Sequence, residues 1–448
     1  MLLVSVACWI GAGCSKPAEG SAGAASTLPS SAASSNAIAA AGPPVRLAIT
    51  DAVNAGVSLA ANGSTVVAVW AAITDGRANI YAAVSRDGAA TFEAPVRVND
   101  RDGDARFSGE QAPRVAIGKD IAVVWPSRQG STSVIRLARS ADSGRTFSHA
   151  TTVHAGALTG ARGWASLSAG PSGDVRVAWL DGRNANAGSH DAAAHGESAH
   201  DAAEHAQAAA HEMHEAMRQD IVFARIAADG ERTESSVATN VCFCCKTSVV
   251  TSASGAIHVA WRHIFPTNLR DIAVGTSTDG GKTFSAPVRV SEDHWQIAGC
   301  PEDGPALAAG DAALHIAWST MTEATPPQKV VFYSYSTDGG HSFAPRVRLD
   351  TGAGAETVAA HAQIVSAGAR VFATWDESAE SRHRIQVREI TSKPGAAAWT
   401  PDLHAAVTFG ADAPATYPAI VALPDGLVLA WTNNAPSGSG VIVQRLRR

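Results

Sequence analysis

Residues 257–290 contain most of a unit that recurs along this chain: IHVAWRHIFPTNLRDIAVGTSTDGGKTFSAPVRV. The unit opens with an apolar run that ends in Trp261, and a second apolar run leads into the turn STDGGKTF at residues 277–284. Alternating apolar residues at this density are typical of β-strands. The APVRV run after the turn predicts a third strand. The unit is therefore expected to form a small antiparallel sheet.

The tryptophan that ends the first run recurs at nearly constant spacing. The seven tryptophans are Trp70, Trp125, Trp179, Trp261, Trp318, Trp375 and Trp431, with spacings of 55, 54, 82, 57, 57 and 56 residues. Only one spacing departs from the period, and an insertion explains it. A repeat of this length built from short strands is the signature of a β-propeller with one blade per repeat. We predict an all-β, seven-bladed β-propeller over residues 43–448.

Four repeats carry a turn of the form Ser-x-Asp-x-Gly-x-Thr-Phe or a close variant. Its aspartates are Asp87, Asp142, Asp279 and Asp338. An Asp carboxylate can accept backbone N–H groups across such a turn, and glycine adopts its left-handed position. These turns resemble the Asp-box, or BNR repeat, of the sialidase superfamily of β-propellers. The resemblance covers about residues 43–448 and implies a structural role for the four aspartates.

The two ends of the repeat region are expected to share one blade. The seventh tryptophan is followed by VIVQRLRR alone, so that unit lacks an outer strand. The segment PPVRLAIT at residues 43–50 matches the outer strands APVRVND and APVRVSE of other units. The N-terminal strand would complete the last blade and remove an open edge. Sialidases usually have six blades, so a six-bladed ring is the alternative, and a seventh blade weakens the case for sialidase activity.

The bulk composition describes a globular, turn-rich protein. The chain of 448 residues is 46% hydrophobic and 17% charged, contains 40 glycines and has a formal net charge of -6. This balance gives no reason to expect nucleic acid as a partner.

The N-terminal segment predicts export. Residues 1–14 combine a short apolar run with small residues and resemble a bacterial lipoprotein signal, in which Cys14 would be lipidated. Residues 15–42 are rich in Ser, Ala, Gly and Pro and are expected to form a tether. We expect a protein of the periplasm or outer membrane, anchored by lipid; an ordinary cleaved signal peptide is the alternative.

A histidine-rich insertion at residues 184–219 follows Trp179 and accounts for the long spacing. Its histidines are His190, His195, His200, His205, His211 and His214. If this segment is helical, His211 and His214 share one face and are candidate metal ligands. The alternative is an Ala-rich surface insertion with no ligand.

Four cysteines are expected on one face of the ring. Cys242, Cys244 and Cys245 lie in NVCFCCKTS, and Cys300 lies in IAGCPEDGPAL. Both segments precede the innermost strand of a blade, and the two blades are neighbours. Three interpretations stay open: two disulfides, a copper or zinc site, or one disulfide plus a reactive pair. Additional ligands of the metal site would be His263 or His361.

The resemblance to sialidases also implies a glycosidase site. Enzymes of that family use a Tyr nucleophile with a Glu partner, an Asp acid/base and three arginines. Tyr417 is the one tyrosine expected on the ligand face, and Asp181 and Arg262 are the accompanying candidates. The early Arg-Ile-Pro motif of such enzymes is missing, and no spacing fixes an arginine triad.

The CxCC and GCPxDGP motifs resemble those of exported BNR-repeat proteins that are called sialidase-like by similarity. We therefore expect a binding protein that takes a metal ion, with copper ahead of zinc, or a glycan or other small ligand. The alternatives are an exo-α-sialidase and a protein-interaction scaffold with structural disulfides.

Overall fold

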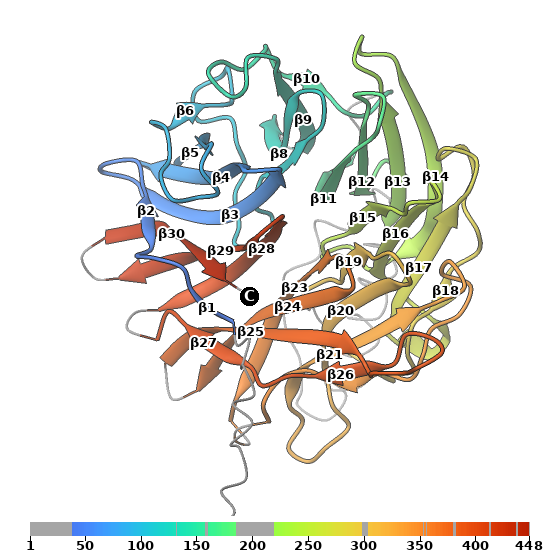
Figure 1. The fold of residues 1–448 in the computed structure, drawn as a ribbon. Coiled ribbons are helices and arrows are strands. Elements are labelled where there is room, and N and C mark those ends of the chain that lie inside the picture. Colours follow the sequence, from blue (N-terminus) through green and yellow to red (C-terminus); the bar gives the residue numbers. More distant parts are fainter. Residues whose placement is uncertain are drawn as a thin grey trace, which may run out of the picture. The chain divides into compact units, whose positions relative to one another are not determined.

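The computed structural model describes residues 38–130, 132–156, 160–184, 219–297, 303–352, 354, 356–379, 382–411, 414–435 and 438–447. The described residues from Ile38 onward belong to one compact unit, built of seven antiparallel sheets arranged in a ring (Figure 1). Within these ranges the helical structure consists of one 3-10 turn, η1 (Pro266–Asn268). No helix in the described part is long and apolar enough to cross a membrane.

Each sheet is one blade, and the strands run outward from the centre in chain order. Blade 1 contains β3 (Val53–Asn62), β4 (Thr65–Thr74), β5 (Arg77–Ser85) and β6 (Val96–Arg97). Blade 2 contains β7 (Arg114–Ile117), β8 (Ile121–Gln129), β9 (Thr132–Ser140) and β10 (Thr151–Thr152). Blade 3 contains β11 (Arg162–Ala169), β12 (Val175–Asp181), β13 (Gln219–Ile226) and β14 (Arg232–Val241).

Blades 4 to 7 follow the same order. Blade 4 contains β15 (Ser248–Thr251), β16 (Ile257–Arg262), β17 (Ile272–Ser277) and β18 (Val288–Arg289). Blade 5 contains β19 (Ala306–Ala309), β20 (Leu314–Met321), β21 (Lys329–Ser336) and β22 (Val347–Arg348). Blade 6 contains β23 (Val358–Ala367), β24 (Arg370–Ala379), β25 (Arg382–Ser392), β26 (Pro401–Leu403) and β27 (Val407–Phe409). Blade 7 contains β28 (Ala415–Leu423), β29 (Gly426–Ala435) and β30 (Gly438–Arg447).

The N-terminal strands complete blade 7, as predicted. β2 (Val45–Leu47) and β1 (Ala39–Ala40) both pair antiparallel with β30, and the blue β2 lies beside the red β30 in Figure 1. Ile38 is buried against this blade. The folded part therefore begins before residue 43, and the predicted end of the tether at residue 42 is too late. The reason is the length of β30, which extends beyond β2 and offers a further edge to pair.

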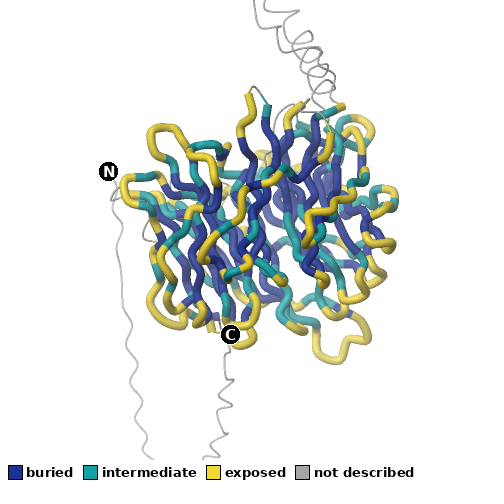
Figure 2. Tube along the Cα trace, turned by 90° about the horizontal axis from the view of Figure 1, so that it is seen from above, coloured by how far each residue is buried: buried dark blue, intermediate teal, exposed yellow. Residues whose placement is uncertain are grey.

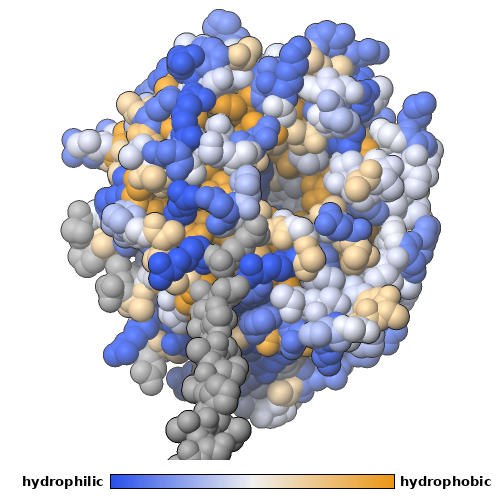
Figure 3. All heavy atoms as spheres, in the orientation of Figure 1, coloured by the Kyte–Doolittle hydropathy of each residue, from blue (hydrophilic) through white to orange (hydrophobic). Residues whose placement is uncertain are grey.

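The ring is closed through its innermost strands. Each contacts the next in the order β3, β7, β11, β15, β19, β23, β28 and again β3. Seven blades are thus present, and the six-bladed alternative is wrong. Buried residues occupy the interiors of the blades, and exposed ones occupy the loops at both ends (Figure 2). On the face drawn in Figure 3, hydrophilic residues cover much of the surface, and hydrophobic ones are visible in the recesses toward the centre.

The seven repeat tryptophans are buried between blades, and most of their indole N–H groups have a polar acceptor. The donor–acceptor pairs are Trp70–Asn54, Trp179–Asp181, Trp261–His263, Trp318–Asp293 and Trp375–Glu377. The indole N–H groups of Trp125 and Trp431 have no acceptor among the described residues. Each blade therefore buries a large apolar ring, and most blades also satisfy its donor.

The four Asp-boxes have the predicted local geometry. In the second box, Asp142 accepts hydrogen bonds from the Thr146 N–H (3.0 Å), the Thr146 hydroxyl (2.6 Å) and the Ser140 hydroxyl (2.7 Å). The bonds from Thr146 hold the pKa of Asp142 well below its usual range. In the first box, Ala89 replaces the usual glycine, yet it adopts the same left-handed conformation with φ of 69°. The turn geometry thus persists without the preferred residue.

We predict that Trp318→Phe destabilises the protein more than Trp125→Phe does. Both changes remove an indole, but only the first removes a hydrogen bond, the one of 2.7 Å to the buried Asp293. An unpaired buried acceptor costs about 1–3 kcal/mol. The free energies of unfolding from denaturant titrations should differ by roughly that amount. Equal losses for the two variants would contradict the assigned role of the indole N–H.

Candidate functional site

The innermost strands of four blades carry a β-bulge near their first residues. The register shifts lie between Ala55 and Ser58 in β3, Gly163 and Ser166 in β11, Ala360 and Gln363 in β23, and Thr416 and Ala419 in β28. Each bulge holds one residue with positive φ: Gly56 (68°), Trp164 (50°), His361 (56°) and Tyr417 (54°). Non-glycine residues pay about 1–3 kcal/mol for such a conformation, which persists mainly where the surroundings impose it. Three of the four bulges thus hold a strained residue with a ring side chain.

In each bulge, a side chain from the preceding blade or its entry loop accepts the backbone N–H of the positive-φ residue. Gly56 donates to Thr432 (3.0 Å), Trp164 to Gln111 (3.2 Å), His361 to Asp303 (2.9 Å) and Tyr417 to Asp376 (2.8 Å). Thr432 belongs to blade 7, Gln111 precedes blade 2, Asp303 precedes blade 5, and Asp376 belongs to blade 6. The bulges are therefore held by contacts between blades, and local sequence does not fix them.

His361 lies at the centre of a charged network. Its Nε2 is 2.6 Å from Glu110, and its Nδ1 is 2.6 Å from Asp376. Its ring lies against that of Tyr417, with centroids 4.2 Å apart. Burial lowers the pKa of His361, but the carboxylates of Asp376, Glu110 and Asp303 outweigh burial and raise that pKa to about 10. The ring is therefore an imidazolium cation at neutral pH and not a free general base.

Two lysines extend the network. The Lys246 ammonium donates to the Ala362 carbonyl (3.2 Å) and lies 4.0 Å from Asp303, while the Lys329 ammonium lies 3.3 Å from Asp303. Burial raises the pKa of Asp303, but Lys329, His361 and Lys246 lower it well below its usual range. Burial lowers the pKa of Lys246, opposed chiefly by Asp303. These buried charges stabilise one another and would be costly alone.

Tyr417 packs over a glycine that the site requires. A Cβ atom added at Gly109 would lie 2.4 Å from the Tyr417 hydroxyl, so any side chain there would displace the phenol. Gly109 precedes Glu110, the partner of His361. Tyr417 is partly exposed, and the side chain of His361 is 17% exposed. Both rings can therefore contact a ligand while their backbones stay fixed.

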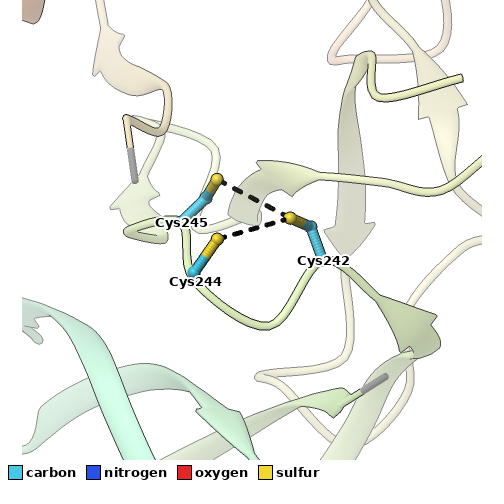
Figure 4. Close-up of side chains that lie close together, drawn as sticks. All are labelled: Cys242, Cys244 and Cys245. Atoms are coloured by element: carbon cyan, nitrogen blue, oxygen red, sulfur yellow. Dashed lines mark hydrogen bonds between the residues drawn. The ribbon is translucent and has the colours of Figure 1, made fainter. Parts of the chain in front are cut away.

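The sulfur cluster lies beside this network, in the connection from β14 to β15. The Cys242 sulfur is 3.8 Å from that of Cys244 and 3.9 Å from that of Cys245, and the three side chains point toward one another (Figure 4). Cys244 is in a disulfide, and Cys242 and Cys245 are free thiols. Of the sequence alternatives, this state corresponds to one disulfide plus a reactive pair.

An arginine stabilises negative charge on the cluster. Arg270 donates to the Cys242 sulfur at 3.1 Å. The hydrogen bond with Cys245 lowers the pKa of the Cys242 thiol to about 6, opposed by burial and aided by Arg270. Burial and the neighbouring Cys242 sulfur raise the pKa of Cys245. The pair therefore shares one proton, which stays on Cys245 near neutral pH.

Of the other site residues predicted from the sequence, Arg262 and Asp181 are buried inside the fold, and His263 lies in a surface groove. Arg262 is buried, donates to the carbonyls of Arg270, Asp303 and Ser319, and lies over the Trp295 ring. Asp181 is also buried, with Arg162 and Arg183 as ion partners. Arg262 and Asp181 therefore stabilise the fold through these contacts, and their side chains do not face a ligand. His263 lines a separate surface groove of about 890 Å³ together with Phe265.

Several predicted residues lie outside the described residues. They are the lipidation candidate Cys14, the candidate ligands His211 and His214, and Cys300. Sequence reasoning missed Trp164, Glu110, Lys246 and Asp303 as members of the central site. Position in the sequence was the available signal. Lys246 directly follows the CxCC motif and Asp303 lies in GCPxDGP, and each comes just before an innermost strand.

Comparisons with known proteins support the fold. No protein-family model and no curated protein sequence matches the chain. An ulvan lyase of polysaccharide lyase family PL25 shares the fold with a TM-score of 0.55 and 11% identity, covering 90% of this chain and 96% of that chain. The PL25 ulvan lyase bound to -[GlcA(1-4)Rha3S]- has a TM-score of 0.54 at 11% identity, covering the same shares. The phage phi92 endosialidase has a TM-score of 0.48 and 10% identity, covering 91% of this chain and 69% of that chain. Identities this low show the fold alone, which is a β-propeller.

We predict that His361 stabilises the fold below pH 7 and loses this effect as the pH rises to 10. Its folded pKa of about 10 lies above the ordinary value of 6.5, so the stabilisation is complete below pH 6.5 and disappears on deprotonation. The free energy of unfolding of the wild type should exceed that of His361→Gln by at most about 5 kcal/mol at pH 6.

The difference should shrink between pH 7 and pH 10, as measured by denaturant titration at each pH. His149→Gln is the control, because that side chain is 97% exposed and its replacement should change little. A constant difference between wild type and His361→Gln across this range would contradict a charged His361.

Proposed function

We propose that the protein is an exported β-propeller that binds a glycan at the centre of its ring. The observation that carries the proposal is the set of three strained residues, Trp164, His361 and Tyr417, that bulges place on the innermost strands. Aromatic rings pack against the C–H faces of sugars, and carboxylates accept sugar hydroxyls. Backbone strain held in place from neighbouring blades is typical of functional sites.

The charges of the network favour an acidic saccharide. Four cations accompany the three carboxylates Glu110, Asp303 and Asp376. They are Lys246, Lys329, His361 and Arg114, whose charge interacts with that of Glu110. One positive charge is left for a ligand carboxylate. The related fold of the PL25 lyase with -[GlcA(1-4)Rha3S]- bound supports a uronate-containing ligand at this kind of ring.

Hydrolysis of the sialidase type is the second candidate. Tyr417 contacts Gly109, next to Glu110, and a Tyr with a nearby Glu is the nucleophile pair of that chemistry. Arg162, Arg262 and Arg270, however, are buried and engaged with other groups. These three arginines therefore cannot serve as the triad that grips a sialic acid carboxylate, so we favour glycan binding over sialidase activity.

The test of binding is isothermal titration calorimetry with a uronate-containing oligosaccharide. Tyr417→Ala should weaken binding about 10-fold to 100-fold, because losing an aromatic contact of 1.4 to 2.8 kcal/mol changes affinity by that factor. Phe265→Ala, in the separate groove, is the control and should bind normally. Binding lost in Phe265→Ala and kept in Tyr417→Ala would move the site away from the centre.

The same variants separate binding from catalysis. Tyr417→Phe keeps the ring and removes the hydroxyl, so a binding protein should keep its affinity. If a chromogenic sialoside is cleaved by the wild type and not by Tyr417→Phe, the hydrolase candidate replaces the binding proposal.

We infer further that residues 1–14 direct export and that Cys14 carries the lipid. Support comes from the apolar run, the small residues before Cys14 and the Ser/Ala/Gly/Pro segment after it. In a bacterial host, Cys14→Ala should move the protein from the membrane fraction to the soluble fraction and abolish palmitate labelling. Labelling that persists in Cys14→Ala would contradict the assignment.

A further inference from the structure

We propose that Cys242, Cys244 and Cys245 form a thiolate site for Cu(I), which stays closed while Cys244 is in its disulfide and opens when that disulfide is reduced. This site borders the glycan site, because Trp164 packs against the cysteines, but the proposal does not depend on the proposed function. It assigns a second ligand, a soft monovalent cation, to the same protein.

The sulfur spacing carries the first step of the argument. All three sulfurs lie within 4.8 Å of one another, and the measured separations are 3.8 and 3.9 Å. Sulfurs that share a metal at about 2.3 Å lie roughly 3.8 Å apart in a tetrahedral site and 4.0 Å apart in a trigonal one. The sulfur–sulfur separations therefore already match those around a bound metal ion, so an ion could enter the cluster with little movement of the backbone.

The type of donor favours copper over zinc. All three ligand atoms of the group are cysteine sulfurs. Soft thiolates suit Cu(I), whereas zinc sites commonly include His nitrogens or carboxylate oxygens. Although His263 lies on the neighbouring blade, its Nδ1 accepts the Trp261 indole N–H at 3.2 Å. We therefore assign the three sulfurs as the ligands and leave His263 outside the set.

The surroundings suit an anionic thiolate complex. Arg270 donates to the Cys242 sulfur. Arg262, the last residue of β16, is also buried. Each of the three cysteines is only 1% exposed, with Trp164, Phe243 and Ile264 packed around them. The arginines compensate the negative charge of bound thiolates, and the apolar shell excludes water, which would favour oxidation of Cu(I).

The disulfide provides the gate. A sulfur in a disulfide is no thiolate, so the oxidised protein offers only Cys242 and Cys245. A small dithiol reductant supplies two electrons and two protons, which convert the disulfide into the Cys244 thiol and its partner thiol, while the reductant becomes a disulfide. Cu(I) then displaces the protons of the cluster thiols as it binds.

The test is anaerobic titration of the full chain with Cu(I) in competition with a chromogenic Cu(I) chelator, before and after treatment with dithiothreitol. The reduced wild type should withdraw one equivalent of copper, and the untreated protein should bind at least tenfold more weakly. Cys242→Ser and Cys245→Ser should weaken binding about 100-fold. His263→Gln is the control and should bind like the wild type.

Alkylation with site-resolved mass spectrometry keeps the proposal testable if a serine variant fails to fold. In the reduced wild type, Cu(I) should protect Cys242, Cys244 and Cys245 from the alkylating reagent. Copper that stays on the chelator with reduced, folded protein would overturn the metal site. Equal binding before and after reduction would overturn the gate, and loss of binding in His263→Gln would overturn the ligand set. None of these readouts involves a glycan.

Discussion

The central site depends on hydrogen bonds from the backbone N–H groups of strained residues to side chains of the preceding blade. Asp376 of blade 6 is one such side chain. Its carboxylate accepts hydrogen bonds from the His361 ring nitrogen Nδ1 and from the Tyr417 backbone N–H. One buried acid thus fixes two ring side chains on neighbouring innermost strands. A β-bulge re-aims one residue in a strand, and a closed ring of strands directs such residues toward a common centre.

The same logic joins the sulfur cluster to the ring centre. Lys246 follows Cys245 directly, and its ammonium reaches the Ala362 carbonyl beside His361. Thr247 donates to the Trp164 carbonyl through both its N–H and its hydroxyl. The cysteine loop is therefore tied to two of the bulged strands.

The fold could be predicted from the sequence because its signals are local and repeated. Trp261, the turn at Ser277 and the strand at Val288–Arg289 recur at one period, and the match of PPVRL to APVRV predicted the exchanged strand. The bulges could not be predicted, because their positive-φ residues are of different types and their acceptors lie in other blades. Cysteine connectivity likewise depends on tertiary placement. Tyr417 was predicted from its place in the repeat to lie on the ligand face, whereas its contact with His361 depends on the tertiary fold.

A crystal structure with a uronate-containing oligosaccharide tests the central claim most directly. The account predicts that the sugar rings lie against His361 and Tyr417 at the inner ends of β23 and β28, with their carboxylate near the lysines of the central network. A saccharide bound at the Asp-box turns or in the groove lined by His263 and Phe265, with the centre free of it, would contradict that claim.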